Sequence, residues 1–235
     1  MNNKSPRPVC VVVGVGPGNG RAFAARFADA GYAVALLARS NEYSTALAAE
    51  FDSMRAYACD VTDAAAITQT FAQIKAELGP VDVLLYNAGS GTWGTFDELA
   101  DEAFETAWKI NVLGFLRCAR AVAGSMRERG RGAIVVSGAT ASLRGKPFTA
   151  AFAQAKAAQR SLAQSLARQL GPEGVHVALV IIDGPIANPS RAASGKDPDE
   201  FLEADDIAAT VYHLATQARS AWSFEVDLRP FRESW

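Results

Sequence analysis

The stretch Val9-Cys-Val-Val-Val-Gly-Val-Gly-Pro-Gly-Asn-Gly20 decides the fold of this 235-residue chain. Its first half is an unbroken apolar run of mainly β-branched residues, which is typical of a strand buried on both faces. Glycines follow at every second position, and the segment from Arg21 to Ala30 then has helical spacing. A strand, a glycine turn and a helix in this order form a phosphate site, because the backbone comes close to the ligand and the free N–H groups of the helix start point at the anion.

The glycine spacing alone leaves an alternative open. Gly14, Gly18 and Gly20 fit a G-x-x-x-G-x-G pattern, which also occurs in ordinary turns between a strand and a helix. The position of the turn, after a buried strand and near the N-terminus, favours a nucleotide site. We therefore expect the cofactor-binding turn to comprise six residues: Gly14, Gly16, Pro17, Gly18, Asn19 and Gly20.

The overall composition bounds the class of protein. Hydrophobic residues make up 49% of the chain and charged residues 20%, so one large α/β domain with a sizeable core is expected over residues 1–235. The net charge of −2 argues against nucleic acid or an anionic membrane as the main partner. No apolar run is long enough to cross a bilayer, and the start of the chain lacks the apolar core of a signal peptide.

The cysteines and histidines suggest neither disulfides nor a metal. Cys10, Cys59 and Cys118 are scattered and odd in number, which indicates reduced, buried thiols in a cytoplasmic protein. His176 and His213 lie far apart in the chain with no cluster of cysteines or carboxylates beside them. We expect no metal site.

The rest of the chain alternates strands and helices. Further strands are expected at 33–38, 55–59, 81–86, 133–137, 175–182 and 223–226, and helices at 44–51, 64–78, 97–130 and 204–218, the third of these broken near Asn111. Right-handed crossovers between such strands give a parallel, doubly wound Rossmann sheet of about seven strands with helices on both faces.

Arg39 indicates the choice of cofactor. The position after the second strand of such a sheet reads the adenosine ribose, where an acid favours NAD and a basic residue favours the 2′-phosphate of NADP. The chain has Arg39 here and no acid before Glu42. A solvated arginine at a strand end is the plain alternative, but the missing acid favours NADP(H) over NAD(H).

Several motifs together resemble the short-chain dehydrogenase/reductase family. They are the glycine turn, Asp60-Val61, Asn87-Ala88-Gly89, Asn111 and Lys156. The resemblance implies an NAD(P)-dependent oxidoreductase acting on the carbonyl or alcohol of a small molecule. It also implies adenine contact by Asp60, cofactor support by 87–89, a helix kink and a bound water at Asn111, ribose binding by Lys156 and a carboxamide contact from Ile186. Two positions depart from the family, which usually has Asn at Tyr86 and Thr at Val13.

The catalytic pair expected from the resemblance is missing. Family members place a Tyr four residues before the Lys, and a Ser thirteen residues before that Tyr. Phe152 and Ala139 stand at these positions. Phenylalanine cannot donate a proton and alanine cannot bind an oxyanion, so the resemblance points to an atypical branch with Lys156 and Asn111 retained.

Nearby hydroxyls are the candidates for a replacement. Ser137 lies two residues before Ala139 on the same strand and should face the same side, and Thr140 and Ser142 follow in the loop. Each of them can instead form local turn hydrogen bonds. Ser137 therefore joins Lys156 and Asn111 as a candidate catalytic residue, although none of the hydroxyls obviously replaces the tyrosine proton.

Two functions stay open at this point. One is an NADP(H)-dependent oxidoreductase with altered proton delivery, and the other is a non-catalytic NADP(H)-binding sensor or partner subunit. Trp93 lies in a glycine-rich loop and is a candidate for lining a substrate pocket or for packing, while residues 186–203 are expected to form the substrate lid. By resemblance, helices at about 100–130 and 150–170 pair in a homodimer or homotetramer.

Overall fold

The computed structural model describes residues 7–188, 195 and 197–233. The parallel, doubly wound sheet of seven strands that the sequence predicts is confirmed, and its strand order is β3-β2-β1-β4-β5-β6-β7. The strands are β1 Val9–Val13, β2 Ala33–Ala38, β3 Met54–Ala58, β4 Val81–Tyr86, β5 Gly132–Ser137, β6 Val175–Ile182 and β7 Glu225–Leu228. The order reverses between β1 and β4, which places a crevice at the carboxyl ends of these two strands.

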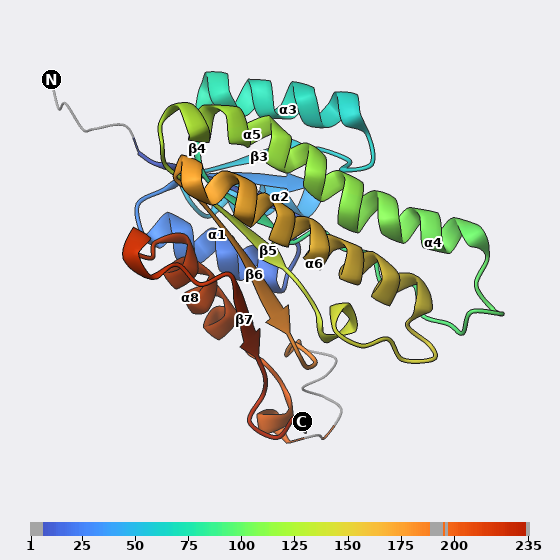
Figure 1. Cartoon of the computed structure of the whole chain (residues 1–235). Coiled ribbons are helices and arrows are strands. Elements are labelled where there is room, and N and C mark those ends of the chain that lie inside the picture. The colour runs from blue at the N-terminus through green and yellow to red at the C-terminus, as the bar shows by residue number, and fades with distance from the viewer. Residues whose placement is uncertain (1–6, 189–194, 196, 234–235) are drawn as a thin grey trace, which may run out of the picture.

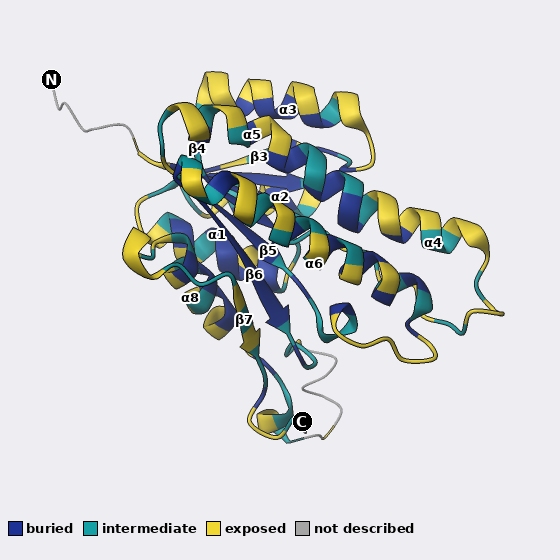
Figure 2. Cartoon of the chain, viewed as in Figure 1, coloured by how far each residue is buried: buried dark blue, intermediate teal, exposed yellow. Residues whose placement is uncertain are grey.

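Helices cover both faces of the sheet (Figure 1). One face carries α1 (Asn19–Asp29), α2 (Glu42–Ala49) and α8 (Ala204–Ala215), and the other carries α3 (Ala64–Glu77), α5 (Phe115–Glu128) and α6 (Ala150–Leu170). Alternate residues of β1 serve the two cores, since Val9, Val11 and Val13 pack on one side and Cys10 and Val12 on the other. Figure 2 shows the five inner strands almost entirely buried, which explains their apolar sequences, whereas the edge strands β3 and β7 are partly exposed.

The long helix expected from 97 to 130 is shorter and continuous. It begins with α4 (Asp101–Trp108), passes through a π-helical turn over Lys109–Gly114, and continues as α5. The sequence therefore locates the irregularity at Asn111 correctly but predicts a break where the structure has a wide turn. A π-helical turn frees backbone carbonyls, and such turns often mark functional sites.

Tyr86 supports this turn. Its hydroxyl donates a hydrogen bond to the backbone oxygen of Ile110, and a Cβ atom at Gly114 would lie 2.4 Å from the same hydroxyl. Glycine at position 114 leaves room for the tyrosine hydroxyl. Tyr86 stands where the family usually has Asn. Its hydrogen bond to Ile110 gives it a structural role in holding the π-helical turn.

The alanine-rich helix α6 uses part of its small-residue surface inside the subunit. Ala151 and Ala155 are fully buried against Ala107 of α4. Ala157 remains exposed. Fewer alanines of α6 are therefore available for contact with a second subunit than the sequence suggests.

We still expect a homodimer or homotetramer, because α4, α5 and α6 form one continuous layer that can pair with a second copy (Figure 1). Light scattering at micromolar concentration measures the mass directly. A stable monomer of 24.8 kDa would contradict this prediction.

Candidate active site

Two connected cavities lie at the carboxyl ends of the strands. One has a volume of about 780 Å³ and is lined by the glycine turn and the ends of β2 and β3. The other has a volume of about 900 Å³ and is lined by residues after β5 and β6 and by the start of α6. Both share Asn87, Gly89, Ser90 and Gly91, which follow β4. Together they form an elongated groove across the switch point of the sheet, where α/β proteins bind their ligands.

Gly14 is fixed by its backbone and by its neighbours. Its φ is +90°, and a Cβ atom there would lie 2.4 Å from the backbone nitrogen of Ala88. Asn87 donates a hydrogen bond of 2.8 Å from Nδ2 to the backbone oxygen of Gly14 and so ties the two loops together. In contrast, Cβ atoms at Gly16 and Gly18 would meet nothing within 4 Å, so this part of the turn is open to a ligand.

The start of α1 fits the phosphates of a dinucleotide. No side chain caps it at Gly18, and its first turn carries no acidic residue. The Oδ1 atom of Asn19 is buried without a hydrogen-bond partner. Free backbone donors, an open glycine backbone and the positive end of the helix dipole together suit an anionic group.

The far end of this cavity holds Arg39 and Asp60. Hydrogen bonds of 2.8 Å from the backbone nitrogen and hydroxyl of Thr62 to Asp60 Oδ1, together with the nearby charge of Arg39, lower the pKa of Asp60. Arg39 is exposed, and within the described part of the chain no hydrogen bond or ion pair engages it. Its guanidinium is therefore available to an anionic group at this end.

Lys156 is buried and lines the larger cavity, and a Cβ atom at Gly89, which both cavities share, would lie 3.7 Å from its Nζ. Its Nζ donates hydrogen bonds of 2.8 Å to the backbone oxygen of Ser137 and 3.0 Å to Oε1 of Gln159. Desolvation lowers the pKa of Lys156 to about 7, so that both protonation states are populated at neutral pH. The side chain retains a proton-carrying atom at the centre of the groove.

Gln159 connects Lys156 to the π-helical turn. Its Nε2 donates a hydrogen bond of 2.8 Å to the backbone oxygen of Asn111, while its Oε1 accepts from Lys156. The Asn111 side chain donates to the backbone oxygen of Ala107, and its Oδ1 is buried without a partner. The sequence analysis missed Gln159, although its position three residues after Lys156 places both on one helix face.

Phe152 makes the cavity apolar beside Lys156. Its ring centre lies 5.7 Å from Lys156 Nζ and 5.4 Å from the ring centre of Trp93. Ala139 lines the same cavity. Trp93 therefore lines the pocket and also packs against Phe152. Both roles that the sequence left open for Trp93 are present in the structure.

The three hydroxyls that the sequence offers as replacements, those of Ser137, Thr140 and Ser142, are each engaged within the protein. Ser137 donates to Oδ1 of Asn87 over 3.0 Å, and Ser142 donates to the backbone oxygen of Ala139 over 2.7 Å. Thr140 donates to Oδ1 of Asp183. Ser137 stays a candidate catalytic residue, but its proton is committed to the loop that supports the cofactor turn.

A sequence profile of the family described as short chain dehydrogenase matches residues 8–198. The chain belongs to the short-chain dehydrogenase/reductase family. Members of this family are NAD(P)-dependent oxidoreductases with the Rossmann fold seen here.

Three relatives show the range of this family. The short-chain reductase protein NovJ of Streptomyces niveus is 32% identical over 96% of this chain and 88% of its own length. The inactive 2-(S)-hydroxypropyl-CoM dehydrogenase 2 of Xanthobacter autotrophicus is 35% identical over 76% of this chain and 79% of its own. Human 17-beta-hydroxysteroid dehydrogenase type 1 is 33% identical over 71% of this chain, which spans only half of the human protein.

Solved structures agree on the fold. A metagenomic short-chain oxidoreductase in complex with NADP has a TM-score of 0.83 and 30% identity, covering 95% of this chain and 96% of its own. An alcohol dehydrogenase from the archaeon Thermococcus sibiricus, complexed with 5-hydroxy-NADP, has a TM-score of 0.85 and 26% identity, covering 97% of this chain and 99% of its own.

Asp183 anchors the C-terminal tail of this family member to the cavity wall. Asp183 is buried, accepts from Thr140, and pairs with Arg229 Nη1 over 2.8 Å and with Arg144 Nη2 over 3.6 Å. A Cβ atom at Gly184, whose φ is +153°, would lie 2.6 Å from Pro230. The tail thus packs on its own subunit, and Glu233 reaches the cavity lining.

The expected lid at 186–203 lies partly outside the described residues, which omit 189–194 and 196. Its two ends are tied together, because Ile186 and Leu202 form a parallel bridge and Ala187 donates to the backbone oxygen of Leu202 over 2.8 Å. Ile186 also lines the larger cavity. Arg232 pairs with Asp197 over 2.9 Å and connects the tail to this segment.

The lowered pKa of Lys156 predicts a pH dependence of stability. A lysine in an unfolded chain titrates near pH 10.4, so between pH 7 and 10.4 the unfolded state binds more protons than the native state. The free energy of unfolding should therefore rise with pH in this window, by on the order of 2 kcal/mol between pH 7 and 9. Urea unfolding of the chain and of Lys156→Met isolates this contribution. Equal pH slopes in both would contradict the burial of a neutral lysine.

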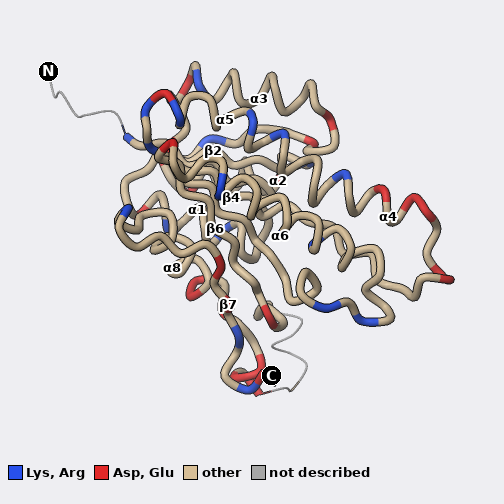
Figure 3. The backbone as a smooth tube through the Cα atoms, in the orientation of Figure 1, with Lys and Arg blue, Asp and Glu red and all other residues tan. Residues whose placement is uncertain are grey.

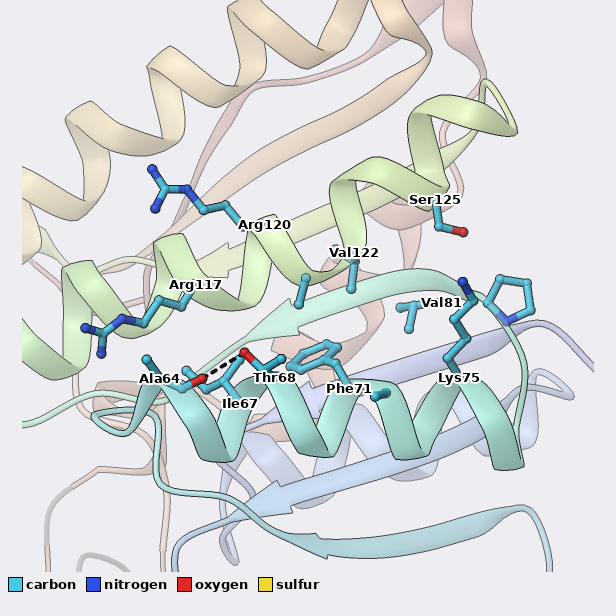
Figure 4. A pocket seen from close by; sticks show the side chains of 13 residues that line it. Ala64, Ile67, Thr68, Phe71, Lys75, Val81, Arg117, Arg120, Val122 and Ser125 are labelled. Carbon is cyan, nitrogen blue, oxygen red and sulfur yellow. Dashed lines mark hydrogen bonds between the residues drawn. The ribbon is translucent and has the colours of Figure 1, made fainter.

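A third cavity of about 450 Å³ lies between α3 and α5, away from this site (Figure 4). Its floor is apolar and includes Ile67, Phe71 and Val122. It shares no lining residue with the two joined cavities.

The described helices include none that is long and apolar enough to cross a membrane.

Proposed function

We propose that this chain binds NADP(H) in the two joined cavities and acts as an oxidoreductase on a small carbonyl or alcohol substrate with an incomplete catalytic set. The observation that carries the proposal is the buried Lys156, which lines the larger cavity beside Gly89, a residue that this cavity shares with the cavity of the glycine turn. When bound, the nicotinamide supplies or accepts the hydride.

Different residues along the groove bind different parts of the cofactor. The glycine turn, residues 14–20, holds the diphosphate, and Arg39 meets the 2′-phosphate while Asp60 and Val61 flank the adenine. Asn87, Ala88 and Gly89 support the ribose side. Lys156 binds the nicotinamide ribose and, with its lowered pKa, holds or releases the proton that the missing tyrosine would have carried. Ile186 meets the carboxamide.

A second candidate function has its own observation in favour. The side chains of Phe152 and Ala139 lack polar groups, and the hydroxyls of Ser137, Thr140 and Ser142 are engaged within the protein. A non-catalytic NADP(H)-binding sensor or partner subunit would need the groove but no proton donor. A relative that is named inactive supports keeping this alternative.

Turnover separates the two functions. NADPH oxidation is followed at neutral pH across a panel of ketones, aldehydes and quinones, with Lys156→Met as the matched variant. A slow rate that disappears in Lys156→Met supports the oxidoreductase. Binding of NADPH with no turnover of any carbonyl favours the sensor.

Arg39 tests the cofactor preference separately. Arg39→Ala should weaken NADPH binding by roughly tenfold to a hundredfold, the scale of a charge-assisted hydrogen bond, and should leave NADH binding unchanged. Calorimetric titrations with both cofactors measure this. The matched control is Arg120→Gln, which removes a positive charge at the α3–α5 cavity. A similar loss of affinity for NADPH and NADH in Arg39→Ala would contradict a contact between Arg39 and the 2′-phosphate.

A further inference from the structure

The larger cavity carries an aromatic wall. Trp93 and Phe152 are in contact, with ring planes at 48°, and Phe148 lines the same cavity. Trp93 is 59% exposed and Phe148 53% exposed, so large apolar rings face the cavity and its mouth rather than the protein core. An exposed apolar patch of this kind beside a cavity indicates a ligand surface.

This wall is held in place by backbone contacts. The backbone nitrogen of Gly94 donates a hydrogen bond of 3.0 Å to the oxygen of Phe148, and Gly94 also forms a bridge with Thr149. The indole of Trp93 lies over Gly91, where a Cβ atom would be 3.2 Å from Nε1. The two loops that bear the rings are therefore joined, and the wall is preorganised.

The same cavity has a positive rim. Arg144 and Lys146 line it from the loop between Ser142 and α6, which carries blue segments in Figure 3. Arg144 lies 3.6 Å from Asp183, whose carboxylate already has a closer partner in Arg229 at 2.8 Å. Within the described residues, Lys146 forms no ion pair. Glu233 also lines the cavity, and its charge acts on Arg229.

We propose that this cavity binds a flat aromatic ring system with an acidic substituent, the rings stacked on the wall of Trp93, Phe152 and Phe148 and the acid directed to Arg144 and Lys146. The inference rests on the proposed function, because it takes the cavity beside Lys156 as the substrate site. Phe152 then contributes a stacking surface at the position where a proton donor is missing.

Calorimetry with three probes tests the ligand class on the chain saturated with NADP⁺. The probes are 2-naphthoate, the neutral 2-naphthalenemethanol and the non-aromatic cyclohexanecarboxylate. We expect 2-naphthoate to bind about tenfold more tightly than either of the others, since only it has both features. Equal affinities for 2-naphthoate and cyclohexanecarboxylate would overturn the aromatic wall, and equal affinities for 2-naphthoate and 2-naphthalenemethanol would overturn the positive rim.

Variants assign the two features to residues. Trp93→Leu and Phe152→Leu should each weaken both naphthalene probes by roughly threefold to tenfold. Arg144→Gln should weaken 2-naphthoate alone. The matched controls are Phe96→Leu, at an exposed ring outside the cavity lining, and Arg120→Gln. Absence of NADP⁺ binding would contradict the proposed function, whereas NADP⁺ binding without naphthoate binding would overturn this inference alone.

Discussion

The double change Phe152→Tyr and Ala139→Ser is expected to raise NADPH-dependent carbonyl reduction by roughly 10²–10⁴-fold, the usual contribution of a general acid–base group. Phe152→Tyr adds one oxygen at the far end of a ring that already faces Lys156, whose Nζ lies 5.7 Å from the ring centre. Ala139→Ser adds a small hydroxyl to the lining of the same cavity. The charge of Lys156 would lower the pKa of the new phenol.

Each single change should give a smaller gain, because the two hydroxyls act on one substrate oxygen. The measurement is NADPH oxidation by the parent and the three variants across the same carbonyl panel. Phe96→Tyr is the matched control, since it adds the same hydroxyl at an exposed ring outside the cavity. Strong parent activity that falls on Phe152→Tyr would contradict our account of the site.

Gly14→Ala is expected to cost about 2–4 kcal/mol in the free energy of unfolding, because a side chain at positive φ is strained and backbone must also move. The φ of Gly14 is +90°, and the added Cβ would lie 2.4 Å from the nitrogen and 2.6 Å from the Cα of Ala88. Urea unfolding of the chain without cofactor measures this loss.

Gly16→Ala separates folding from cofactor binding. A Cβ atom at Gly16 meets nothing within 4 Å, so the unfolding free energy should change little. The same methyl group would stand in the open part of the turn and should weaken NADPH binding. If Gly14→Ala and Gly16→Ala destabilise the chain equally, our reading of the glycine turn is wrong.

The fold follows from the sequence because its signals are local and repeated. Strands such as Val9–Val13 and Val175–Ile182 are continuous apolar runs, and glycine turns or capping residues separate them from amphipathic helices. The ends of elements are less well predicted. β7 begins at Glu225 rather than Ser223, since backbone pairing with β6 and not side-chain pattern sets its start.

The site is only partly readable from the sequence. Motif spacing identifies the glycine turn, Lys156, and the absent Tyr and Ser. It does not identify Gln159 or the pairing of Asp183 with Arg229, because these depend on contacts between segments distant in the chain. Tyr86 shows this most clearly. The presence of Tyr where the family usually has Asn is explained by the contact of its hydroxyl with Gly114, which the sequence does not reveal.

Calorimetric titration of the unchanged chain with NADPH and with NADH tests the central claim most directly. The two joined cavities and the exposed Arg39 predict one NADPH bound per chain, with at least about tenfold lower affinity for NADH. Absence of NADPH binding, or tighter binding of NADH, would contradict the account.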